Sequence, residues 1–232
     1  MRVDVAFVPA ESREAPTGIV IDAIRATSTI CQALAAGYSR VFCTAEIEEA
    51  RALRSVLGEG VLGGERDNVV IPAFDLGNSP REYVEAQGET LILTTTNGTR
   101  AIVTAAARSE RVLIASFLNV SAIVEAAWEE GEDAVVVCAG VQGAFALDDA
   151  FVAGKIVSEL GWERTDAAEA AARLAETWSG AEEAFRASKS GHNLLENAPE
   201  LEGDIAFCAR ESVLDVVPRL VRMDGAAAEI TL

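Results

Sequence analysis

Histidine, basic residues and paired cysteines are scarce in this sequence. A single histidine, His192, stands among 232 residues, which excludes metal sites built from several histidines. Lysine and arginine together number 19 against 37 aspartates and glutamates, giving a net charge of -18. Because nucleic acids and anionic membranes are bound by basic surface, both partners are disfavoured. A small anionic ligand must therefore meet local cations or a metal ion in its site.

Several short signals are also missing. None of the cysteines forms a CxxC pair, which indicates reduced thiols in a cytosolic protein: Cys31, Cys43, Cys138 and Cys208. The N-terminal residues lack the apolar core of a signal peptide, and no apolar run approaches the ~20 residues of a membrane span. There is no Walker A motif, no cysteine-phosphatase loop and no Asp-x-Asp pair after a strand. We therefore expect a soluble, cytoplasmic protein.

What the sequence does contain is an alternation of short apolar segments with amphipathic ones. The predicted strands are 3–8, 18–22, 40–43, 60–63, 90–94, 111–115, 134–138, 214–222 and 228–232. The predicted helices are 27–36, 46–57, 79–86, 97–108, 119–130, 148–160 and 166–178.

This alternation is typical of an α/β protein whose central sheet is covered on both faces. We predict one domain over 1–232, with three α/β/α layers and a mostly parallel or mixed sheet. Residues 165–210 are expected to form consecutive helices, as an insertion or cap. The segment 212–232 returns to strand character and is expected to join the edge of the sheet.

Three strand-to-helix junctions carry unusually many polar groups, and function in parallel sheets sits at such carboxyl ends. In the first, Asp22 is a candidate cation ligand and Arg25 a candidate phosphate clamp. The hydroxyls of Thr27, Ser28 and Thr29 are candidate donors to phosphate oxygens. A helix N-cap with a surface salt bridge explains the same pattern, so both readings stay open.

The second junction follows the predicted strand 90–94 and favours anion binding at a helix N-terminus. Helix capping explains one polar side chain at this junction and does not explain the others. The candidate binding residues are Thr95, Thr96, Asn97, Gly98, Thr99 and Arg100.

The third junction follows the strand 134–138 and leads to adjacent carboxylates, Asp148 and Asp149. They suit a hard divalent cation, although acids are also favourable in the first turn of a helix. Cys138, at the strand end, is a candidate nucleophile, although a buried thiol there is usually inert.

Two further stretches contribute candidates. Glu65 is a second possible metal ligand and Arg66 a possible anion clamp, beside two glycines at a strand end. Ser79 and Glu82 fit a helix capping box, and a ligand-binding role for Asn78 is added to that account.

Taken together, these motifs resemble the 2-phosphosulfolactate phosphatases over most of the chain, roughly 1–222. The motifs that carry the resemblance are Asp22 to Thr29, Gly64-Glu65-Arg66, Phe74 to Pro80, Thr94 to Thr99, Cys138-Ala139-Gly140 and Leu147-Asp148-Asp149. The resemblance implies a three-layer α/β fold and Mg²⁺-dependent hydrolysis of 2-phosphosulfolactate to sulfolactate and phosphate, a step toward coenzyme M. This chain departs from the family pattern at Asp148, where Glu is usual, at Asp67, where Gly is usual, and at Ser212, often an acid.

Our working hypothesis assigns Mg²⁺ to Asp22, Glu65, Asp148 and Asp149. Arg25, Arg66 and Arg100, with the 95–99 loop, are expected to hold the phosphate and a second acidic group. Direct attack by water and a phospho-enzyme both remain open. The alternatives are a phosphatase of another phosphorylated hydroxy acid and a non-catalytic protein that binds phosphometabolites. A homodimer is the default expectation for assembly.

Overall fold

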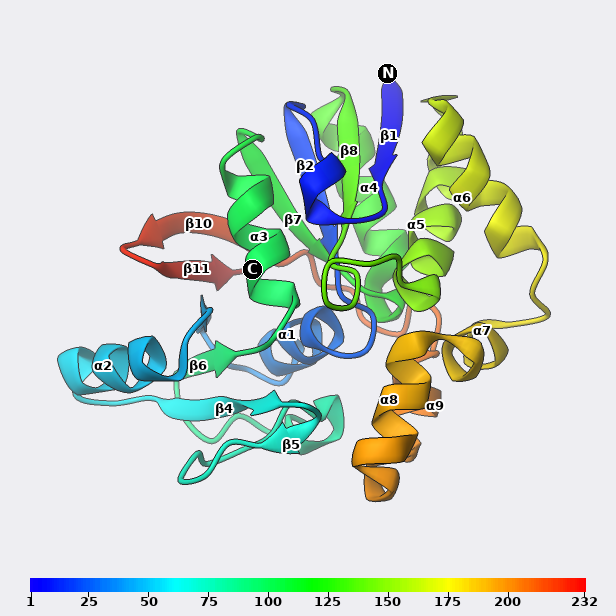
Figure 1. Ribbon diagram of the computed structural model, residues 1–232. Coiled ribbons are helices and arrows are strands. Elements are labelled where there is room, and N and C mark those ends of the chain that lie inside the picture. The colour runs from blue at the N-terminus through cyan, green and yellow to red at the C-terminus, as the bar shows by residue number, and fades with distance from the viewer.

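The computed structural model describes all residues, 1–232, as a mixed sheet with helices on both faces (Figure 1). The strands are β1 Arg2–Ala6, β2 Thr17–Ile21, β3 Arg40–Thr44, β4 Val61–Arg66, β5 Val69–Val70, β6 Thr90–Thr94, β7 Arg111–Ala115, β8 Ala134–Cys138, β9 Glu163–Arg164, β10 Arg219–Asp224 and β11 Ala227–Thr231. The α-helices are α1 Ala26–Ala35, α2 Ile47–Leu57, α3 Gly98–Ala106, α4 Val120–Glu130, α5 Leu147–Leu160, α6 Asp166–Glu176, α7 Ala181–Ala187, α8 Lys189–Asn197 and α9 Gly203–Cys208.

Apart from the short strand β5, which pairs antiparallel with β4, the sheet consists of two parallel halves joined by an antiparallel hairpin. Its strand order is β5-β4-β6-β3-β11-β10-β7-β2-β8-β1-β9. Strand β11 pairs antiparallel with β3, and β10 pairs antiparallel with β7. In Figure 1, β7, β2, β8 and β1 stand upright while β4 and β6 lie across the view. The segment 212–232 was expected to join the edge of the sheet, and this is wrong. Its two strands, β10 and β11, lie in the middle of the sheet, between β7 and β3.

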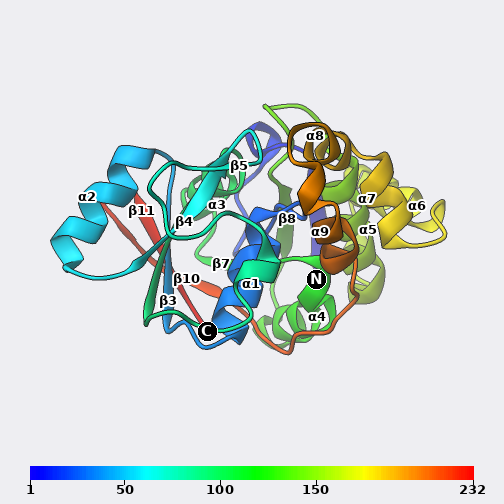
Figure 2. The same cartoon turned by 90° about the horizontal axis from the view of Figure 1, so that it is seen from below.

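The two faces of the sheet are covered by different helices, as predicted for three layers. Consecutive residues of β2, such as Ile19 and Val20, are both fully buried and belong to different core clusters, one on each face. One face packs on α4, α5 and α6, and the other packs on α1 and α3. Helix α2 covers the far side of the β4–β6–β3 half, where Phe42, Leu62 and Ile92 are buried. Figure 2 shows α2 and α6 at opposite ends of the molecule with α1 between them.

Helices α6 to α9 follow one another between β9 and β10, as expected for 165–210. Phe185, Leu194 and Ile205, from α7, α8 and α9, belong to the same apolar cluster as β2 and β8. A Cβ atom on Gly191 would lie 2.1 Å from the carbonyl oxygen of Phe185, so α8 approaches the end of α7 closely. The segment is therefore packed into the main core. No helix in the structure has the length and apolar character needed to cross a membrane.

The helix expected at 79–86 is reduced to a single 3-10 turn, Pro80–Glu82. Ser79 makes no side-chain capping bond there. Its hydroxyl donates instead to Asp204 of α9, at 2.7 Å. The hydroxyl of Ser79, which the local pattern assigned to a helix cap, is thus bound by Asp204, 125 residues further along the chain.

Candidate active site

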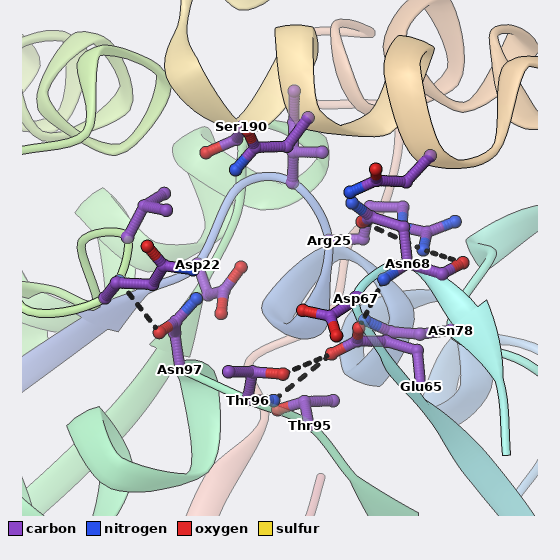
Figure 3. A pocket seen from close by; sticks show the side chains of 15 residues that line it. Asp22, Arg25, Glu65, Asp67, Asn68, Asn78, Thr95, Thr96, Asn97 and Ser190 are labelled. Atoms are coloured by element: carbon purple, nitrogen blue, oxygen red, sulfur yellow. Dashed lines mark hydrogen bonds between the residues drawn. The ribbon is translucent and has the colours of Figure 1, made fainter.

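A polar cavity opens where β2, β4 and β6 end, beneath helix α8 (Figure 3). Fifteen residues line about 160 Å³ of space, and only two of them are hydrophobic. Because about 30 Å³ of liquid holds one water, this volume suits a small organic molecule. The predicted residues that the structure brings together here are Asp22, Arg25, Glu65, Asn78, Thr95, Thr96 and Asn97.

The β2–α1 turn presents Asp22 to the cavity and uses its hydroxyls internally. Asp22 Oδ1 accepts from the amide of Ala26 at 3.2 Å. Thr27 donates to the carbonyl of Asp22, Ser28 to that of Ala23 and Thr29 to that of Asn78. All three hydroxyls are buried and point away from the cavity lining. In this structure they hold the turn that positions Asp22, and their role as phosphate donors stays a prediction.

Arg25 lines the cavity but is tied to a partner that the sequence reading missed. Its Nη1 lies 2.7 Å from Asp204 Oδ2, and both side chains are buried. Asp204 Oδ1 also accepts from Ser79, so this ion pair is fixed from α9. Nη2 of Arg25 points toward the carbonyl and Oδ1 of Asn68, at 3.5 and 3.4 Å. The charge of Arg25 is therefore already neutralised by a carboxylate.

Glu65 is held by the loops on either side of it. Its Oε1 accepts from the amide and hydroxyl of Thr96, at 3.2 and 3.1 Å, and its Oε2 from the amide of Asn68, at 2.8 Å. The next residue, Arg66, turns away and donates to the carbonyls of Glu65 and Ala45 and to Thr94. Arg66 does not line the cavity, so the structure does not bring it together with the other predicted anion-binding residues.

The hairpin between β4 and β5 carries two further lining residues, Asp67 and Asn68. Their φ angles are 54° and 67°, and positive φ at both central positions is the signature of a type I′ turn. This turn brings both side chains to the cavity rim. The Asp67 carboxylate makes no hydrogen bond or ion pair with the protein.

The β6–α3 junction divides into a half that lines the cavity and a half that does not. Thr95, Thr96 and Asn97 line it. A Cβ on Gly98 would lie 2.5 Å from Ala26 Cβ and 2.9 Å from Asp22 Oδ2, so glycine permits α3 to approach α1. Thr99 is buried with its hydroxyl 3.5 Å from that of Thr95. Arg100 is exposed and borders a neighbouring surface hollow, so the structure does not bring it together with the cavity-lining residues.

Asp148 and Asp149, at the start of α5, lie buried behind the cavity rather than on its lining. Asp149 accepts from the amides of Ala23 and Gly140 at 2.8 and 2.9 Å. Asp148 Oδ1 accepts from Ser190 at 2.8 Å, whereas its Oδ2 is buried without a partner. An orphaned carboxylate oxygen of this kind is an open place for a proton or a cation.

Burial of these acids disfavours their charged forms. It raises the pKa of Asp22 from 3.8 to about 7, with the negative charges of Asp148 and Glu65 adding to the effect. Burial likewise raises the pKa of Asp148 to about 6, and it raises that of Asp149 well above its ordinary value. Carboxylates crowded in this way gain stability from a bound cation.

No three Asp, Glu, His or Cys side chains form a ready-made metal cage. The donors nevertheless fit a magnesium ion, which is commonly held by one or two carboxylates together with water and substrate phosphate. Asp22 faces the cavity and Asp148 has an oxygen to spare. Glu65 and Asp149 have both oxygens engaged by the protein, so they fit such an ion less well.

Cys138 does not fit the role of nucleophile. It is fully buried at the end of β8 and does not line the cavity. Burial raises the pKa of its thiol well above the ordinary value, and the charge of Asp149 adds to this. The thiol therefore stays protonated and has no access to a ligand in the cavity.

Sequence reasoning missed the wall that α8 contributes. Ser190, Asn193 and Asn197 line the cavity from this helix. Their spacing of three and four residues places them on one face, and this is the only local signal that pointed to them. No local pattern pointed to Asp204, because its role depends on a contact with Arg25, which lies 179 residues away in the chain.

A cavity at the carboxyl ends of parallel strands, lined by charged and amide side chains, is typical of α/β enzymes with small polar substrates. Comparison with known families agrees and is more specific. Residues 6–223 match the model of the 2-phosphosulpholactate phosphatase family, and the chain belongs to that family. It is thus an enzyme of the phosphoric monoester hydrolase class.

Similar curated proteins span nearly the whole chain. A protein of Thermotoga petrophila is 43% identical over 94% of this chain and 95% of its own length. One of Carboxydothermus hydrogenoformans is 36% identical over 94% of this chain and 92% of its own length. Both are named probable 2-phosphosulfolactate phosphatase.

Proposed function

We propose that this protein hydrolyses 2-phosphosulfolactate to sulfolactate and phosphate in a reaction that requires Mg²⁺. The names of its relatives support the substrate. The charge balance of the cavity supports the metal ion: Asp22, Glu65 and Asp67 line it, and the one guanidinium among the lining residues is already paired with Asp204. A phosphomonoester dianion is repelled from such a cavity unless a divalent cation binds with it.

In this proposal Asp22 and Asp148 would hold the metal ion, which would supply positive charge to neutralise the phosphoryl group and the leaving oxygen. Thr95, Thr96 and Asn97 stand at the N-terminal end of α3, where the main-chain N–H groups that Glu65 does not engage suit phosphoryl oxygens. Glu65 fixes Thr96 through two hydrogen bonds and so holds this loop in place. Helix α8 covers the cavity and limits the access of bulk water.

Phosphate release tests the proposal. The wild-type protein is expected to release phosphate from 2-phosphosulfolactate with Mg²⁺ and not with EDTA. Asp22→Asn keeps the size of the side chain but removes a metal ligand, and it is expected to lower kcat by ~10³-fold or more, as loss of metal-ion catalysis would. Asp215→Asn, at an exposed acid far from the cavity lining, is the matched control. Full Mg²⁺-dependent turnover by Asp22→Asn would refute the assignment.

A substrate panel separates this function from the alternatives. If another phosphorylated hydroxy acid were turned over faster than 2-phosphosulfolactate, that compound would be the substrate, and the protein would still be a phosphatase. Ligand-induced thermal stabilisation without phosphate release would indicate a binding protein instead. We also propose that the protein acts in the cytoplasm, on the path to coenzyme M; its four free, buried cysteines suit a reducing compartment.

A further inference from the structure

Five asparagine side chains line the active-site cavity. Apart from Asn97, at the start of α3, they form what we term the amide cluster: Asn68, Asn78, Asn193 and Asn197. The side-chain nitrogen of none of them donates a hydrogen bond within the protein, whereas Asn119, outside the cavity, donates to two carbonyls. Asn78 is only 5% exposed; its Oδ1 is an acceptor without a partner, and its side-chain nitrogen donates to no group of the protein. A buried amide such as that of Asn78 is normally satisfied by the protein, whereas Asn68, Asn193 and Asn197 are partly or fully exposed to the cavity. All four side-chain nitrogens are therefore free to donate to a ligand in the cavity.

The cluster is built on fixed elements. Asn193 and Asn197 stand four residues apart on α8, whose start is capped by Ser188 accepting from Gly191 at 2.9 Å. Asn68 accepts from Arg25, which the buried carboxylate of Asp204 holds in place. Because Asp204 cancels the charge of Arg25, this side of the cavity offers N–H donors with little net positive charge.

The opposite side of the cavity has a different character. In Figure 3, Asp22 and Asn97 lie at one side, and Arg25, Asn68 and Asn78 lie at the other. The phosphoryl group belongs near Asp22, because a dianion needs the metal ion that Asp22 holds in the proposed function. A second acidic group of the substrate then extends toward the amide cluster.

The chemistry of the substrate decides which acidic group that is. The carboxylate of 2-phosphosulfolactate is attached to the carbon that carries the phosphate, whereas the sulfonate is one carbon further away. A sulfonate spreads a single charge over three weakly basic oxygens. Because each of the three oxygens accepts hydrogen bonds, several amide N–H donors arranged together suit such a group.

We propose that the amide cluster is the sulfonate-binding subsite and that it determines preference for sulfonated over unsulfonated phosphate esters. This inference rests on the proposed function for the identity of the substrate. Two esters distinguish it from a merely structural role: 2-phosphosulfolactate, and 2-phospholactate, which carries a hydrogen where the sulfonate would be.

The test compares wild type with Asn193→Ala/Asn197→Ala, and with Glu196→Gln as a matched control on an exposed position of α8. The double variant is expected to lower kcat/KM for 2-phosphosulfolactate ~10- to 100-fold more than for 2-phospholactate, mainly through KM, as loss of hydrogen bonds to a charged group predicts. Glu196→Gln is expected to leave both values unchanged. Equal losses on both esters, or no loss on either, would overturn the subsite while leaving the proposed function intact.

Calorimetric binding of sulfolactate, with lactate as the unsulfonated reference, gives a readout independent of turnover. Wild type is expected to bind sulfolactate more tightly than lactate, and the double variant is expected to lose that preference. If wild type hydrolysed neither ester yet showed this pattern, the subsite would stand and the proposed function would fail. If the variant kept the preference for sulfolactate, the subsite assignment would be wrong.

Discussion

The buried acids behind the cavity predict an unusual response of the metal-free protein to pH. A raised carboxyl pKa in the folded state means that the folded protein holds its proton more firmly than the unfolded chain does. The stability from this cluster is therefore present below about pH 4 and lost as pH rises through about 7. For Asp22, whose pKa rises from 3.8 to about 7, the loss amounts to about 4 kcal/mol.

The perturbation that isolates the effect is Asp148→Asn. It keeps a side-chain oxygen for Ser190 and removes one of the repelling charges. The rise in the pKa of Asp148 from 3.8 to about 6 corresponds to about 3 kcal/mol. In EDTA, the variant is therefore expected to exceed wild type in unfolding free energy by up to about 3 kcal/mol at pH 8, and by much less at pH 4 to 5.

Urea unfolding across this pH range, with and without Mg²⁺, is the assay. At pH 8, Mg²⁺ at 100 times its dissociation constant is expected to add about 2.7 kcal/mol to wild type. At pH 5, protons compete for the same oxygens and the gain is expected to vanish. Asp215→Asn, at an exposed acid, serves as control for the loss of one charge. A difference between Asp148→Asn and wild type that does not vary with pH would refute the reasoning.

Three further outcomes follow from contacts at the site. Asp204→Ala leaves Arg25 buried without its partner and is expected to cost about 3–5 kcal/mol in urea unfolding, with Asp204→Asn milder because Ser79 keeps its acceptor; equal stability of all three proteins would contradict this. Gly98→Ala places a methyl group 2.5 Å from Ala26 Cβ and is expected to cost about 1–3 kcal/mol and to reduce phosphate release, whereas Gly180→Ala, with open space around it, is expected to do neither. Cys138→Ala is expected to keep kcat within a few-fold of wild type, and loss of turnover in a folded variant would restore the thiol as a candidate.

How far the sequence predicted this fold depended on how local each signal was. Strands β6, β7 and β8 begin and end where their apolar runs predicted. A strand that is buried on both faces is apolar at consecutive positions, so its bounds can be read from the sequence. The position of β10 and β11 in the sheet was not predicted. Their pairing with β7 and β3 joins segments far apart in the chain, and the residues of 212–232 carry no local pattern that specifies it.

The site divides in the same way. Asp22, Glu65, Thr96 and Arg100 were predicted to meet, since the ends of parallel strands share one edge of the sheet. The first three line one cavity, whereas Arg100 borders a neighbouring hollow. The direction of side chains within each loop was not predictable: Thr27 and Arg66 have the right chemistry but satisfy nearby carbonyls. The contributions of α8 and α9 depended on how a helical segment folds back over the sheet, which its amphipathic pattern does not specify.

The hairpin at the centre of the sheet has a consequence for how the molecule is made. Its two strands are translated after all the others, so β3 and β7 carry bare hydrogen-bonding edges while the rest of the protein emerges from the ribosome. Until the hairpin arrives, each half is open to pairing with another nascent chain. Insertion of β10 and β11 therefore joins the two halves of the sheet. It also covers the strand edges of β3 and β7 through which the chain could aggregate.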